Sequence, residues 1–200
     1  GVFARMLTEL ATAGQDTETV MIDVEPVVRH WSEDHRRGHL KAHRTAASLR
    51  GQKGGQAPEG RLIGRTKGGL NSKLHVVADA KGRPLRMFLS AGHRSDYLGA
   101  KAMLSSLPKA KTLIADRGYD ADWFRWALAD RGVAACIPAR RGRKVPIPHD
   151  PALYRQRHRI ETAFGRLKDW RRLATRHDRC PIAFLSACAP AAVVLFWCES

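Results

Sequence analysis

Apolar residues recur along the chain with two periods, one typical of helices and one typical of strands. Helical spacing predicts helices over residues 2–13, 98–107, 122–130 and 154–168, and short apolar runs predict strands over 20–22, 73–79, 84–90, 112–115 and 133–137. Residues 80–83 join two of these strands as a hairpin turn. Strands that come first and then alternate with helices indicate an α/β domain with a mixed sheet.

Residues 181–198 are almost entirely apolar, so they have the composition of a membrane helix. Pro181 and Pro190 interrupt the stretch, and it is close to the shortest length that can span a bilayer. We therefore expect a buried helix here and no membrane segment.

The charge of the chain indicates what it binds. Lys and Arg number 35 against 19 Asp and Glu among 200 residues, which gives a formal net charge of +16. Such an excess favours a polyanionic partner, because each neutralised phosphate releases condensed counterions. A catalytic nucleic-acid protein and a basic structural one are both compatible with it.

The four cysteines form no Cys-x-x-Cys pair, and no secretory signal opens the sequence, so reduced thiols in the cytoplasm are expected. His35, His39 and His43 would align on a helix as metal ligands, but Gly38 interrupts them. A solvated basic segment is the better interpretation of this stretch.

The predicted helix 154–168 carries an unusual edge. At about 100° per residue, Tyr154, Arg157, Glu161 and Lys168 fall within an arc of about 60°, beside an apolar stripe suited to packing on a sheet. An ordinary surface pair between Arg157 and Glu161 would leave the other two residues of this edge unexplained. A single carboxylate among cations and a phenol suits a divalent metal next to a phosphate.

This spacing resembles the Y-R-E-K signature of the DDE transposases of insertion sequences. A second motif of that family, an Asp at the end of a strand followed by Gly and an aromatic residue, is matched by Asp116, Gly118 and Tyr119. Segments 64–75, 143–150 and 164–172 also resemble the family, so the resemblance covers most of residues 60–198.

The resemblance implies a fold and a chemistry. It implies that residues 1–200 form a single ribonuclease-H-like catalytic domain, a mixed five-stranded sheet flanked by helices. Asp23, Asp116 and Glu161 map onto the three acids that hold two Mg²⁺ or Mn²⁺ ions, whose hard charge suits carboxylate oxygens. The implied activity is metal-dependent cleavage and strand transfer of DNA at insertion-sequence ends.

The resemblance also implies how DNA is held. Tyr154, Arg157 and Lys168 would contact the DNA backbone, and the adjacent Arg171 and Arg172 extend the basic surface. The implied partners are transposon ends and target DNA, bound by a homodimer at the nucleoid in the bacterial cytoplasm.

The chain departs from the family pattern in two places. Glu25 stands where relatives have Thr, and residues 24–38 are interpreted as an insertion or a stretch read from a shifted frame. The helical region that precedes this core in the family is expected to be missing. An alternative function is therefore a catalytically inactive remnant that at most binds DNA.

Overall fold

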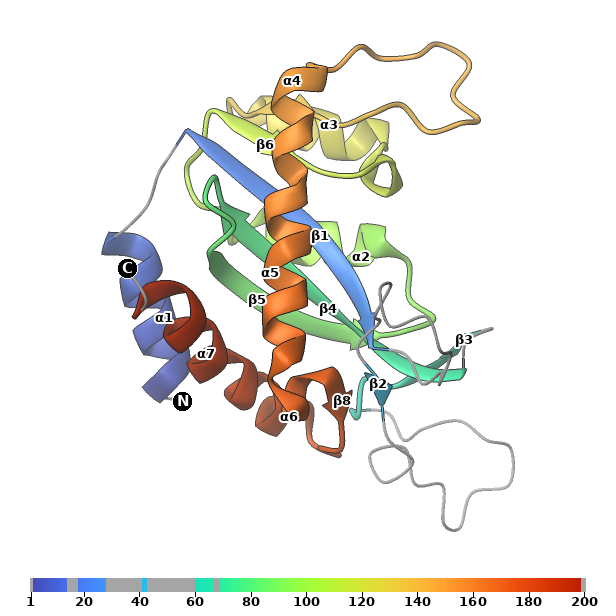
Figure 1. Ribbon diagram of the computed structural model, residues 1–200. Helices are drawn as coiled ribbons and strands as arrows, with labels where there is room; N and C mark the ends of the chain where they lie inside the picture. The colour runs from blue at the N-terminus through green and yellow to red at the C-terminus, as the bar shows by residue number, and fades with distance from the viewer. Residues whose placement is uncertain (1, 14–17, 28–40, 43–59, 67–68, 199–200) are drawn as a thin grey trace.

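The computed structural model describes residues 2–13, 18–27, 41–42, 60–66 and 69–198. Its elements, labelled as in Figure 1, are α1 (Val2–Ala13), β1 (Thr19–Val27), β2 (Lys41–Ala42), β3 (Gly64–Thr66), β4 (Gly69–Asp79), β5 (Pro84–Ala91), α2 (Asp96–Leu104), β6 (Thr112–Ile114), η1 (Arg117–Tyr119), α3 (Asp122–Asp130), β7 (Ala134–Cys136), α4 (Pro151–Tyr154), η2 (Arg155–Arg157), α5 (His158–Asp169), α6 (Arg171–Ala174), β8 (Thr175–Arg176) and α7 (Pro181–Trp197).

The main sheet has the predicted mixed topology. Five strands lie in the order β5-β4-β1-β6-β7, with β4 antiparallel to β1 and β5, and with β6 parallel to β1 and β7. The expected ribonuclease-H-like fold, a mixed sheet flanked by helices, is confirmed. A sixth strand that the sequence did not predict, β3, pairs with the first residues of β4. A separate parallel ladder joins β2 to β8.

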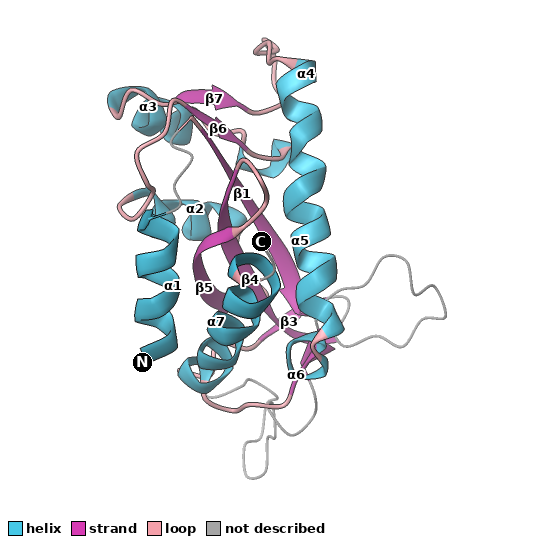
Figure 2. Cartoon of the chain, turned by 60° about the vertical axis from the view of Figure 1, so that its left-hand side comes forward, coloured by secondary structure: helices cyan, strands magenta, loops and turns pink. Residues whose placement is uncertain are grey.

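Helices cover both faces of this sheet, and β1 lies in the middle. Successive side chains of a strand point to opposite faces, so Met21 packs in the core with α5 and α7, and Ile22 packs in the core with α2 and α3. Figure 1 shows α5 crossing the near face of the sheet, and Figure 2 shows α2 and α3 on the other side. The face that carries α5 is the one that matters for the candidate site.

The predicted helix 154–168 is three consecutive elements, α4, η2 and α5. Asp150 accepts hydrogen bonds from the amides of Ala152 and Leu153 and so caps α4, and Pro151 occupies its first turn, where a missing amide costs nothing. The tighter turn η2 follows before α5 begins at His158. Because residues 154–158 all keep right-handed helical backbone angles, the predicted edge survives this change.

Two further boundaries differ from prediction. Helix α2 begins at Asp96, directly after Ser95, and ends at Leu104, whereas the apolar spacing predicted residues 98–107. Strand β1 continues through Val24–Val27, the first residues of the proposed insertion, in unbroken register with β4. Residues 28–38 of that stretch lie outside the described residues, as do His35, His39 and His43.

The apolar segment near the C-terminus forms the buried helix that was expected. Helix α7 packs against α1 and α5, and Phe184, Cys188 and Ala192 are fully buried. Among the helices that the structure describes, none is long and apolar enough to cross a membrane. All four cysteines are free, with Cys136 and Cys188 buried.

Candidate acidic site on the edge of helix α5

Two of the predicted acids lie on the same face of the sheet as α5. Asp23 follows Met21 by two residues on β1, and Asp116 follows Ile114 by two residues after β6. Met21 and Ile114 are paired across the parallel ladder and belong to the same core as α5. Since side chains alternate between faces and the backbone at Asp116 is still extended, both carboxylates project toward α5.

Arg157 connects the first acid to the third. Its Nη2 donates to Oδ2 of Asp23 at 2.7 Å, and its Nη1 donates to Oε1 of Glu161. The two carboxylates come from residues 138 positions apart in the sequence and share one guanidinium. The structure therefore brings Asp23 of β1 next to Arg157 and Glu161 on the predicted edge of the helix.

Burial controls the ionisation of Asp23. Asp23 is only 6% exposed, and this loss of hydration is the main reason that its pKa is raised to about 6. Repulsion from Asp116 contributes to this rise, whereas the positive charge of Arg157 and the amide of Val24, which donates to Oδ1 at 2.9 Å, oppose it. A buried carboxylate with a second one near enough to repel it needs a cation. Arg157 supplies that cation here.

The donor set fits a divalent ion in chemistry, but the described residues contain no group of three or more His, Cys, Asp or Glu side chains spaced to hold one. Two features explain this spacing. The guanidinium of Arg157 lies between Asp23 and Glu161, and Oδ1 of Asp116 accepts the amide of Gly118 at 2.9 Å. The carboxylate oxygens are the hard ligands that Mg²⁺ and Mn²⁺ prefer. Metal binding would thus exchange one cation for another.

Lys168, the last residue of the signature, forms an ion pair with Glu25, the residue that departs from the family pattern. Its Nζ lies 2.8 Å from Oε1 of Glu25, and both side chains are about four-fifths buried, at 21% and 18% exposed. Glu25 shares the face of β1 with Asp23 because the two are two positions apart along the strand. That alternation, together with the conspicuous acid at the Thr position, was the signal that could have predicted this ion pair.

The other predicted DNA contacts lie around this edge. Tyr154 is half-buried against the ring of His149, and burial raises the pKa of its phenol. Arg171 is exposed on α6, and Arg172 on the same helix pairs at 2.8 Å with Asp178, which follows β8. These side chains lie on α4 and α6, the short helices on either side of η2 and α5 in the sequence.

Sequence analysis missed one buried group close to the acids. Tyr119 is fully buried, and its hydroxyl has no hydrogen-bond partner among the described residues. Burial and the nearby charges of Asp23, Asp96 and Asp116 raise the pKa of this phenol. Tyr119 was recognised as part of the second acidic motif, but only as an aromatic residue. Its position beside the acids could not follow from a one-dimensional pattern.

Most of this chain is similar in sequence to known proteins. Residues 39–182 match the family model described as the transposase DDE domain. A protein named as a transposase for insertion sequence element IS6501 of Brucella ovis is 38% identical over 125 residues, which span 60% of this chain and 96% of that protein. One named for IS402 of Burkholderia cepacia is 31% identical over 140 residues and is matched over 64% of its own length.

Solved structures resemble this chain more weakly. A chain of the simian T-cell lymphotropic virus intasome in complex with PP2A regulatory subunit B56 gamma has a TM-score of 0.48 at 12% identity, covering 86% of this chain and 47% of that one. The Mos1 transposase in its paired-end complex with the left transposon end has a TM-score of 0.34 at 8% identity, covering 82% and 58%. Because both scores are below 0.5, the fold assignment stands on the strand order of the sheet itself.

Proposed function

Because the chain belongs to the transposase DDE domain family, we propose that it cleaves DNA at the ends of an insertion sequence and joins the cut ends to a target. In this proposal Asp23, Asp116 and Glu161 hold two Mg²⁺ or Mn²⁺ ions. The single observation that carries the proposal is the pair of bonds from Arg157 to Asp23 and Glu161, with Asp116 close enough to raise the pKa of Asp23.

A structural role alone accounts poorly for this cluster. Asp23 is paired with Arg157, but Asp116 also lies near enough to raise the pKa of Asp23, and a pair that only stabilised the fold would not need this second acid. Such repulsion lowers stability unless a further positive charge relieves it. Acids that are kept close despite mutual repulsion are typical of sites that bind cations.

The residues of the chain itself would bind and orient the DNA. When bound, divalent ions at such carboxylates activate an attacking water or hydroxyl and stabilise the leaving oxygen. Arg157 and Lys168, released from Asp23 and Glu25, would be available to phosphate oxygens beside the scissile bond. Tyr154 on α4 would add a phenol donor to the same DNA strand, and Arg171 and Arg172 would extend the contact with its backbone.

DNA is the partner that the charge of the chain supports. The formal charge of +16 is large enough to drive binding by counterion release. In this proposal two copies of the chain hold a pair of ends and the target, at the nucleoid of a bacterial cytoplasm.

Cleavage of a labelled duplex that carries the border of the element tests the proposal. We expect Mn²⁺-dependent cutting by the full chain, its loss to background in Glu161→Ala, and its retention in Glu9→Ala, which removes an exposed acid on α1. DNA binding should persist in both variants. Salt-sensitive binding without any cutting by the unmodified chain would instead support the inactive remnant.

A further inference from the structure

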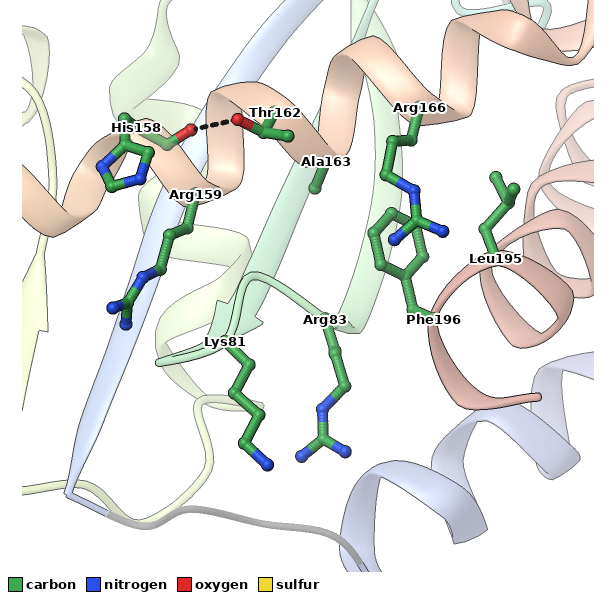
Figure 3. A pocket seen from close by; sticks show the side chains of 9 residues that line it. All are labelled: Lys81, Arg83, His158, Arg159, Thr162, Ala163, Arg166, Leu195 and Phe196. Carbon is green, nitrogen blue, oxygen red and sulfur yellow. Dashed lines mark hydrogen bonds between the residues drawn. The ribbon is translucent and has the colours of Figure 1, made fainter. Parts of the chain in front are cut away.

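A hollow of about 330 Å³ lies on the other side of α5 from the acids. Three segments that are far apart in the sequence line it: the β4–β5 turn with Lys81 and Arg83, the outer face of α5, and the end of α7. The lining residues are Lys81, Arg83, His158, Arg159, Thr162, Ala163, Arg166, Leu195 and Phe196. We call this hollow the basic pocket, and Figure 3 shows it.

Four cationic side chains and one histidine line the basic pocket, and no carboxylate does. Figure 3 shows Arg159 and Arg166 reaching from α5 toward the turn that carries Lys81 and Arg83. The buried Asp79 pairs with Arg83 at 2.7 Å and offsets its charge. Arg159 donates to the neutral carbonyl oxygen of Ala80, which leaves its positive charge in place. Cations that line one hollow repel one another, so an anion bound there would lower the free energy of the folded chain.

The walls of the basic pocket are held in place before any ligand binds. The guanidinium of Arg83 lies 4.1 Å from the ring centre of Trp197, and that of Arg166 lies 4.7 Å from Phe196. Such stacking orients both groups. Gly82 adopts a φ of +85°, and a Cβ there would come within 2.8 Å of the carbonyl oxygen of Arg159. The turn therefore lies directly on α5, which fixes the distance between the two sets of cations.

The basic pocket and the acids lie on different sides of one helix. At about 100° per residue, Arg159, Thr162 and Arg166 are between about 100° and 160° around α5 from Glu161. A helix with its side chains is about 10 Å across. A phosphate in the basic pocket is thus a different phosphate from one beside the acids.

We propose that the basic pocket binds a backbone phosphate of DNA at a position away from the scissile bond. Guanidinium groups bind phosphate oxygens with two parallel hydrogen bonds, and Lys81 adds a point charge that is not paired with any carboxylate of the described residues. The apolar floor of Ala163, Leu195 and Phe196 suits the sugar next to that phosphate. This inference rests on the proposed function in one respect only, that the partner is DNA.

The salt dependence of duplex binding by the full chain tests this proposal. Lys81→Gln with Arg159→Gln removes two charges from the basic pocket, whereas Lys101→Gln with Lys109→Gln removes two exposed charges elsewhere. We expect the first pair to weaken binding roughly fivefold at moderate salt and to reduce the slope of log affinity against log salt by about 1. The second pair should leave the slope unchanged.

Two further arms make the result unambiguous. Lys81→Arg with Arg159→Lys keeps the charges and should keep the slope, so a loss there with an unchanged melting temperature would contradict the proposal. Titration with inorganic phosphate distinguishes a free anion from DNA. If phosphate stabilises the unmodified chain but the glutamine pair binds duplex normally, the pocket serves a small anion and the DNA assignment is wrong.

The outcome is separable from the cleavage assay. A normal slope in the glutamine pair overturns the basic pocket as a DNA site, even if the unmodified chain cuts DNA. A reduced slope supports it even if no cutting is found, because binding and chemistry are measured independently. Failure of the unmodified chain to bind duplex at all would overturn both proposals.

Discussion

Lys168 on α5 and Glu25 on β1 form an ion pair with an Nζ–Oε1 distance of 2.8 Å, although 143 residues separate them. The pair lies beside the bonds that join Arg157 to Asp23 and Glu161. Two cations of the Y-R-E-K edge are therefore already engaged by acids of the chain. Any phosphate that binds this edge competes with those acids.

Glu25→Gln should release Lys168 and strengthen DNA binding. We expect affinity for a duplex to rise several-fold and the salt slope to steepen by about 1, because one more cation can contact phosphate. The free energy of unfolding should fall by about 1–3 kcal/mol, because the mostly buried Lys168 loses its ionic partner and keeps only a neutral amide. Fluorescence anisotropy at several salt concentrations measures the binding.

Glu18→Gln is the matched control for this charge change. Its partner Lys111 and Glu18 itself are largely exposed, at 77% and 66%, and the pair is remote from α5 in the element order. Glu18→Gln removes one negative charge, as Glu25→Gln does. Equal effects of the two substitutions on the salt slope would show that net charge alone, and not the release of Lys168, is responsible.

Asp120 should hold the basic loop 140–144 against the domain. Its buried carboxylate accepts from Arg125, from Arg143 and from the amide of Arg140. Although burial raises the pKa of Asp120, these bonds outweigh it and lower the pKa to about 2. Asp120→Asn should reduce the free energy of unfolding at neutral pH by about 2 kcal/mol.

Limited proteolysis with trypsin detects the same change locally. The loop contains several Lys and Arg residues, so its release in Asp120→Asn should make it the first site of cleavage. Asp130→Asn, at the exposed end of α3, should digest like the unmodified chain. An unchanged digestion pattern in Asp120→Asn would mean that the loop is anchored by other contacts.

Stability should fall as the solution is acidified through the range in which His75 titrates. The pKa of His75 is lowered to about 4, mainly by burial; Asp96 raises it slightly and Lys73 lowers it slightly. The ring stacks on Phe88. Its Nε2 lies 2.7 Å from Oγ of Ser90. Between pH 6.5 and 4 the unfolded chain binds a proton that the folded chain does not. The unfolding free energy should therefore drop by about 3 kcal/mol from this group.

Urea unfolding across this pH range checks the prediction. His75→Gln should be less stable at pH 7 but should show a flatter pH profile. His93→Gln removes an exposed imidazole and should keep the profile of the unmodified chain. A profile in His75→Gln that is parallel to that of the unmodified chain would assign the acid sensitivity to carboxylates.

The fold and part of the site could be predicted because they depend on local periodicity. Helical spacing placed Arg157 and Glu161 on one edge, and the motif around Asp116 placed that acid at the end of a strand. The position of Asp23 followed from resemblance, and the alternation of β1 and β6 explains it in physical terms. These relationships repeat over a few residues and are visible in the sequence.

Other features depend on contacts between distant segments and had no local signal. Arg176 is fully buried and donates to Oγ of Ser72 and to the carbonyl oxygen of Arg61, at 2.6 and 2.7 Å. A buried arginine contradicts the usual preference of its side chain for solvent. The basic pocket likewise needs a turn, a helix and the end of the chain to meet, which composition and spacing cannot indicate.

Binding of Mn²⁺ to the DNA-free chain, followed by the loss of the free-ion signal in electron paramagnetic resonance, tests the central claim most directly. The account predicts binding by the unmodified chain, none by Asp116→Asn, and unchanged binding by Asp130→Asn. Mn²⁺ should likewise raise the melting temperature of the unmodified chain and of Asp130→Asn, but not that of Asp116→Asn. Equal binding by the unmodified chain and Asp116→Asn would contradict the account, because the ion would then lie away from the acids beside α5.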